Sequence, residues 1–90
     1  MRQAIVSPEE LRKFASDLKR FNDALKENFG QLHGRFKQLG ETWRDQEHKK
    51  FEKDFDQTGR AIKLFLAASD EYVPFLIRKA LAAEEYLNTK

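Results

Sequence analysis

The feature that most constrains this chain is a stripe of apolar side chains that recurs every three or four residues from Leu11 to Leu39. At about 100° per residue this spacing confines the stripe to an arc of roughly 120° on one helix, with charged side chains around the rest. The stripe consists of Leu11, Phe14, Leu18, Phe21, Leu25, Phe29, Leu32, Phe36 and Leu39. Ser7, Pro8 and Glu10 form a predicted N-terminal capping box, so the sequence predicts a first helix over about residues 8–39.

A second stripe follows a short interruption. Gly40 ends the first pattern, residues 40–45 are predicted as a turn, and Asp45 is a predicted N-cap for the next helix. The second stripe consists of Phe51, Phe55, Ile62, Phe65, Leu66, Val73, Leu76, Ala80 and Leu87. It predicts a helix over about residues 46–87, and because the stripe keeps its phase across Pro74 we interpret that proline as a kink. A separate short helix that begins at Pro74 is the alternative.

The length of the first helix decides the fold class. At 1.5 Å per residue it spans about 48 Å, too long for a compact globule of 90 residues, so we expect one elongated all-α antiparallel hairpin over residues 1–90. Pairing the stripes about the bend gives a predicted register. It places Leu32 opposite Phe51, Phe21 opposite Ile62, Leu18 opposite Phe65 and Leu11 opposite Tyr72.

In this register the second helix extends beyond Ser7 from about Pro74 onward, which leaves apolar side chains without cover. Soluble monomers seldom expose so much contiguous apolar surface, so we infer a partner, most simply a second copy that completes a four-helix bundle. The predicted dimer interface consists of Leu64, Phe75, Leu76, Ile77, Leu81 and Leu87.

Trp43 stands in the turn, three residues after Gly40. We expect its indole to cover the last core layer, formed by Leu39, Phe36 and Phe51, and to leave its N–H for a carbonyl or water. A docking cleft at the hairpin tip is the alternative interpretation of the same side chain.

These residues resemble those of the WXG-motif family, the small ESAT-like helical hairpins associated with type VII secretion. The resemblance rests on the opening IVSPEELRKFASDL, on Leu39 and Trp43 four residues apart, and on Phe51 eight residues after Trp43. It implies a non-enzymatic protein that pairs with itself or with a relative into an antiparallel four-helix bundle. It also implies a chain that is secreted without a cleavable signal peptide, or cytoplasmic before export.

The chain departs from the family pattern in two places. The turn motif is Trp43-Arg44-Asp45, with aspartate where the family has glycine. The usual C-terminal export pattern is a tyrosine followed four residues later by an acid, whereas Tyr86 is followed at that spacing by Lys90. The resemblance therefore implies either export with a partner that carries the signal or a branch that does not use that route.

Catalysis and metal binding have little support in the sequence. No cysteine is present, and no nucleophile elbow, phosphate-binding loop or pocket for paired carboxylates can be identified. His33 and His48 meet near the bend, where Asp45 or Glu47 would complete a metal site, but we interpret them as solvent-exposed polar residues. We therefore predict no enzyme activity, cofactor or metal. No segment reaches the roughly 18 apolar residues of a membrane span, and the opening MRQAIV lacks the apolar run of a secretory leader.

Nucleic-acid binding is the other class of function to weigh, beside a cytoplasmic helical adaptor. Lys49, Lys50 and Lys53 cluster near the bend, close to Arg35 and Lys37. Acidic residues interrupt this cluster, and 17 Lys and Arg against 15 Asp and Glu give a net charge of only +2. Nucleic-acid binding is therefore a minor alternative.

Overall fold

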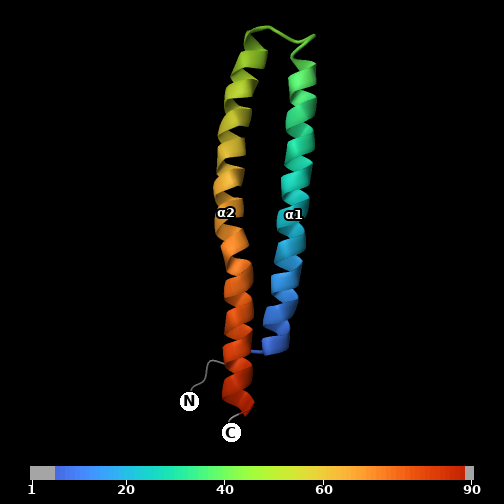
Figure 1. Cartoon of the computed structure of the whole chain (residues 1–90). Coiled ribbons are helices and arrows are strands. Elements are labelled where there is room, and N and C mark those ends of the chain that lie inside the picture. The colour runs from blue at the N-terminus through green and yellow to red at the C-terminus, as the bar shows by residue number, and fades with distance from the viewer. Residues whose placement is uncertain (1–5, 89–90) are drawn as a thin grey trace.

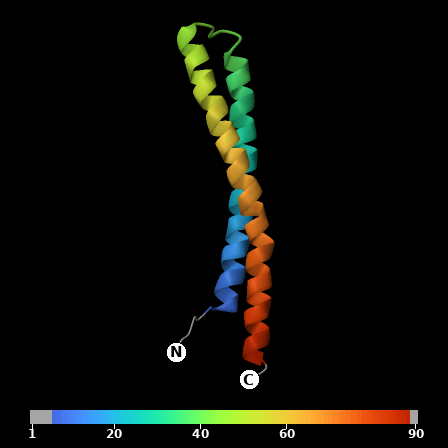
Figure 2. The ribbon, with the colours of Figure 1, turned by 90° about the vertical axis from the view of Figure 1, so that its left-hand side faces the viewer.

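The fold is a two-helix hairpin. The computed structural model describes residues 6–88, which form α1 (Pro8–Leu39) and α2 (Gln46–Asn88) and contain no strand. The helices run antiparallel side by side and are joined by a short turn (Figure 1). Seen from the side they cross at a shallow angle (Figure 2), and the molecule measures 68 × 22 × 14 Å. The predicted all-α antiparallel hairpin is confirmed.

The ends of α1 are held by local hydrogen bonds. The Ser7 hydroxyl accepts a hydrogen bond from the backbone N–H of Glu10 at 3.2 Å, and Pro8 occupies the first turn, where a missing N–H has no cost. At the other end, the N–H of Gly40 donates to the carbonyls of Phe36 and Lys37 at 3.2 Å each. The sequence signals for the start and end of this helix therefore act where they were expected.

Pro74 lies inside α2, which continues through it to Asn88. Because proline has no N–H, the carbonyl of Asp70 loses its helical hydrogen bond at this point. The surrounding turns keep the helix continuous, so no separate short helix begins at Pro74.

The predicted register is wrong by about one helical turn. Phe65 packs edge-on against Phe21 with ring centroids 6.2 Å apart, rather than opposite Leu18. Phe51 packs against Phe36 at 5.4 Å, rather than opposite Leu32. Contacts at the tip hold the observed alignment, because Phe36 packs there on His48, Phe51 and Phe55 of α2.

The predicted overhang of α2 is largely absent, because the shift brings more of its C-terminal part beside α1. Ala80 is completely buried, and Leu76 and Ala83 are half-buried. Glu84 receives two hydrogen bonds from the Arg12 guanidinium, at 2.6 and 2.8 Å. Only the end of α2 extends past the start of α1 (Figure 1). An unpaired overhang therefore does not explain why this chain would need a partner.

The core is narrow and includes polar side chains. Buried residues follow the facing sides of the two helices and are Ala15, Asn22, Phe55, Gly59, Leu66, Ser69 and Ala80. Asn22 is fully buried, and its amide donates to Asp70 Oδ1 at 3.1 Å while its carbonyl accepts from the Ser69 hydroxyl at 2.8 Å. Phe21, which the sequence places in the core, is 53% exposed. The reason is that a single neighbouring helix covers less than the full arc of the stripe.

Two glycines should respond in opposite directions to alanine. A Cβ at Gly59 would lie 2.9 Å from Cζ of Phe29, so the Phe29 ring would have to shift and disturb its stacking at 5.3 Å on Phe55. A Cβ at Gly34 would meet nothing within 4 Å. We expect Gly59→Ala to destabilise the hairpin by about 1–3 kcal/mol through overpacking. Gly34→Ala should stabilise it by about 0.5–1 kcal/mol through helix propensity. Urea unfolding followed by circular dichroism compares them, and equal effects would contradict this account.

Candidate association surface

The turn motif ties the ends of the two helices together. The backbone N–H of Trp43 donates to the carbonyl of Leu39 at 2.9 Å, and Nε of Arg44 donates to the carbonyl of Gly40 at 3.0 Å. Both bonds satisfy carbonyls at the C-terminus of α1, which no helical N–H can reach. Asp45 then caps α2, since its Oδ1 accepts the backbone N–H of His48 at 2.9 Å. Each residue of the motif therefore has a structural task.

The Asp45 carboxylate is stabilised in its charged form. The backbone N–H of His48 is the main cause that holds the pKa of Asp45 below its ordinary value, with smaller contributions from the Trp43 side chain, the backbone of Glu47 and the charge of His48. Aspartate can therefore begin α2 where the family motif has glycine.

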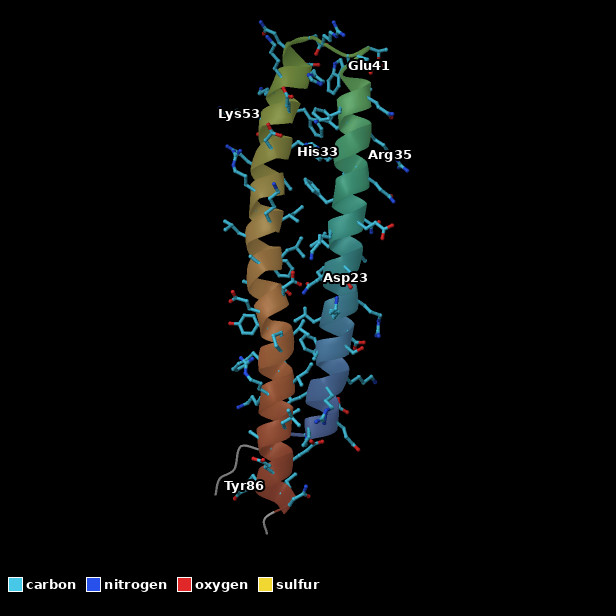
Figure 3. All side chains as sticks on the ribbon, in the orientation of Figure 1. Asp23, His33, Arg35, Glu41, Lys53 and Tyr86 are labelled. Atoms are coloured by element: carbon cyan, nitrogen blue, oxygen red, sulfur yellow. The ribbon has the colours of Figure 1, made fainter. Side chains whose placement is uncertain are left out.

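An aromatic stack fills the space behind the turn. The His48 ring lies on Phe36 with centroids 5.0 Å apart and an interplanar angle of 8°, and Trp43 meets His48 edge-on at 5.0 Å. His33 stacks on Phe55 at 6.0 Å and lies between the helices (Figure 3). The expectation that both histidines are solvent-exposed is therefore wrong, since each is half-buried. Within residues 6–88 no three His, Cys, Asp or Glu side chains are placed to hold a metal ion.

One side of the hairpin carries a row of partly exposed apolar side chains, which we call the aromatic flank. Its members lie seven or eleven residues apart on α1, and mostly seven or fourteen apart on α2, spacings that return to the same side of a helix. Phe21 and Phe65 meet across the two helices, and Tyr72 contacts Phe75 at 5.8 Å. The aromatic flank consists of Phe14, Phe21, Leu32, Leu39, Phe51, Phe65, Tyr72 and Phe75, which are each 45–57% exposed.

The opposite side is closed by charged pairs. Arg12 with Glu84 and Lys26 with Asp70 bridge the two helices, the second at 3.3 Å. The pKa of Glu84 is lowered, chiefly by its hydrogen bonds from Arg12. The hairpin is therefore two-sided, with ion pairs across one seam and uncovered rings along the other.

The predicted interface residues are scattered over this two-sided molecule. Phe75 belongs to the aromatic flank, whereas Leu76 is half-buried. Leu87 is exposed and follows Phe65 by 22 residues, about 40° around α2, so it lies on the side of the aromatic flank. Leu64, Ile77 and Leu81 are exposed elsewhere on α2, Leu64 by 74%. Leu81 lies sixteen residues after Phe65, roughly 160° around α2 from it. Most of the aromatic flank was missed because its members belong to the stripes that the sequence assigns to the core. The available signal was the width of those stripes, which exceeds what one neighbouring helix can cover.

Two of the basic residues near the bend lie on different sides of the hairpin. Arg35 points outward from α1 and Lys53 outward from α2, on opposite sides of the hairpin (Figure 3). The Lys90 position of the export pattern lies outside the described residues, as does most of the opening MRQAIV. Among residues 6–88, no helix combines the length and apolar character that crossing a membrane requires.

Two ion pairs and one helix cap make the stability of the hairpin depend on pH in the acid range. The pKa values of Asp45, Glu84 and Asp23 are lowered, that of Asp23 chiefly by a hydrogen bond from Lys19. Each therefore adds stability that is present above its ordinary pKa, 3.8 for Asp and 4.5 for Glu, and is lost as the pH falls through the lower folded value. We expect Tm to be level above this range and to fall below it. Glu84→Gln should make the fall shallower, and a Tm that rises on acidification would contradict the assignment.

Comparisons with known proteins agree with this architecture. The sequence matches the WXG100 family, described as proteins of 100 residues with WXG, over residues 3–73. Among solved structures, a single-residue variant of the secreted protein EsxB from Bacillus anthracis superposes with a TM-score of 0.75 at 23% identity, covering 93% of this chain and 97% of that one. A selenomethionine-labelled EsxB gives 0.73 at 24% identity, covering 99% and 98%. No curated protein sequence matches the chain. The family match spans well over half of the chain, so this protein is a member of the WXG100 family.

Proposed function

We propose that the chain acts as an ESAT-like, non-enzymatic protein of the secretion-associated kind, and that it works by helix–helix association through the aromatic flank. The observation that carries the proposal is the uncovered row of rings. Eight large apolar side chains, each about half exposed, offer on the order of 100 Å² apiece. Together they approach the roughly 800 Å² per partner that a stable protein interface buries.

The partner that fits this surface is a second copy or a WXG100 relative. Two hairpins that meet flank to flank produce an antiparallel four-helix bundle, in which the exposed rings of both become a common core. The ion pairs on the other seam stay in water. Family membership supports the choice, as does the EsxB-like fold. By the same reasoning the protein is secreted, or is cytoplasmic before export.

The interface is tested by measuring mass with light scattering. We expect about twice 10.6 kDa for the wild type, or a mixed dimer when a relative is co-expressed. Phe21→Asp and Phe65→Asp should each give a folded monomer, because a charge would be buried in the new core. Leu81→Asp is the matched control from the interface predicted by sequence, and it should leave the mass unchanged. If only Leu81→Asp dissociated the dimer, the interface predicted from sequence would be favoured over the aromatic flank. If the wild type were monomeric both alone and with the relative, both interfaces would be refuted.

Export is a separate part of the proposal and has its own test. A tagged chain should appear in the culture medium of its native cell. When the ATPase of the type VII secretion system is deleted, the chain should no longer reach the medium, while its level inside the cell stays the same. Retention inside the cell in both strains would show that this member is not exported.

A further inference from the structure

The side of the hairpin away from the aromatic flank carries a groove between the helices in the half nearest the tip. Two hollows, of about 440 and 290 Å³, form it, and they adjoin because His33 and Asp56 line both. Gly30 follows Phe21 by nine residues and Arg60 follows Phe51 by nine, which is two and a half helical turns in each case. The groove therefore faces away from the surface proposed for dimerisation.

Glycines open this groove. Gly30 and Gly59 line the larger hollow and Gly40 lines the smaller one, which accounts for three of the four glycines in the chain. At Gly59 the packing of the hairpin explains the glycine, since Phe29 occupies the place of a Cβ. At Gly30 the packing gives no such explanation, because a Cβ there would meet nothing within 4 Å. A glycine inside a helix costs about 1 kcal/mol relative to alanine, and the fold gains nothing from this one.

The rim of the larger hollow is mainly cationic. Lys26, Arg60 and Lys63 stand around it with one carboxylate, Asp56. Lys26 Nζ forms an ion pair with Asp70 Oδ2 at 3.3 Å. Among the described residues, no carboxylate lies within 4.0 Å of Arg60 or Lys63. The floor is apolar and includes Phe29, Phe55 and Leu66. A ligand for this site must combine apolar surface with negative charge.

We propose that this groove docks an acidic amphipathic helix of another protein, with its small or aliphatic side chains above Gly30 and its carboxylates facing Arg60 and Lys63. The larger hollow runs beside α1 from Lys26 to His33, about 11 Å at 1.5 Å per residue, which matches two turns of a helix. The smaller hollow is lined by Glu41, Glu52 and Asp56 with Lys37, so the acidic part of the bound helix lies over the larger hollow. The exposed backbone at Gly30 allows the close approach that such packing needs. A second copy of this chain would bring the same cationic rim and is disfavoured here. The site does not depend on the dimer, because the two surfaces lie on different sides.

Fluorescence anisotropy with two designed peptides tests the proposal. Both are 20-residue amphipathic helices with the same Leu and Ala stripe, one flanked by Glu and the other by Lys. We expect saturable binding of the Glu peptide and at least ten-fold weaker binding of the Lys peptide. Arg60→Glu with Lys63→Glu should reverse this preference. Equal binding of both peptides by the wild type, or no binding of either, would overturn the proposal.

A matched pair of glycine variants locates the binding site. Gly30→Leu fills the groove and should weaken the Glu peptide at least ten-fold. Gly34→Leu makes the same change one turn along α1, at a position that lines neither hollow, and should leave binding unchanged. Circular dichroism and light scattering verify that both variants keep the fold and mass of the wild type. Equal losses in the two variants would place the peptide elsewhere. Binding by a Phe21→Asp monomer would separate this site from the dimer interface.

Discussion

Phe55→Ala is expected to lower the free energy of unfolding by about 3–5 kcal/mol, the usual range for a fully packed phenylalanine. Phe55 is only 9% exposed and contacts four other rings. Its centroid lies 5.3 Å from Phe29, 6.0 Å from His33, 5.1 Å from Phe36 and 5.9 Å from Phe51. Alanine would leave a cavity at the point where the two helices hold the tip together, and this thin hairpin has few other buried side chains to compensate.

The loss is large relative to the whole, because domains of this size have roughly 5–13 kcal/mol of stability in total. Urea unfolding at a fixed protein concentration measures it, since dimerisation makes the apparent stability depend on concentration. With both changes made in the monomeric Phe21→Asp background, Phe65→Ala is the matched control, because Phe65 is 47% exposed in the hairpin and has less contact to lose within it. A loss at Phe65 in the isolated hairpin as large as that at Phe55 would mean that the stack at the tip is not the centre of the fold.

The helices and their caps were predictable because their signals are local. Ser7 and Asp45 cap the helices they precede, and the 3.6-residue periodicity of the stripes fixed the fold class. Register was not predictable in the same way. An apolar stripe that repeats every three or four residues matches its partner equally well after sliding by one turn. The choice then depends on shapes at a few contacts, such as Phe36 against His48, which periodicity does not encode.

The association surface was harder to predict for a related reason. The stripe on α1 is wider than one neighbouring helix can cover, so part of it must stay exposed, but the sequence does not say which edge. The way the two helices cross (Figure 2) decides this. Phe14 and Phe21 are left more than half exposed. The sequence did contain a signal for the buried Asn22 amide. Asn22 stands in the apolar stripe between Leu18 and Leu25, and Ser69 stands in the other between Leu66 and Val73.

That polar pair provides the second large effect. Asn22→Ala should cost about 2–3 kcal/mol, because it leaves the buried Ser69 hydroxyl without its acceptor and opens a small cavity. Replacing both partners, as in Asn22→Leu with Ser69→Ala, should restore most of the stability, since no buried polar group is left alone. In this double variant, however, the two helices should no longer be held in a single register. Within residues 6–88, Asn22 is the one large side chain that is fully buried. Its amide can keep both hydrogen bonds only in the alignment that places Ser69 and Asp70 beside it.

Asn22→Asp separates this polar role from simple packing. The change keeps the shape of the side chain but directs a second carboxylate at Asp70, whose Oδ1 lies 3.1 Å from the present amide nitrogen. Two carboxylates so close cannot both stay ionised without cost, so the variant should be less stable than Asn22→Ala at neutral pH. Its folded-state pKa would then be raised, and the lost stability should return as the pH falls and one carboxyl takes up a proton. Thermal melts from pH 7 to pH 5 should show Tm rising in the variant while the wild type stays level. If Tm changed with pH in the same way in the variant and in the wild type, Asn22 would act only by filling space.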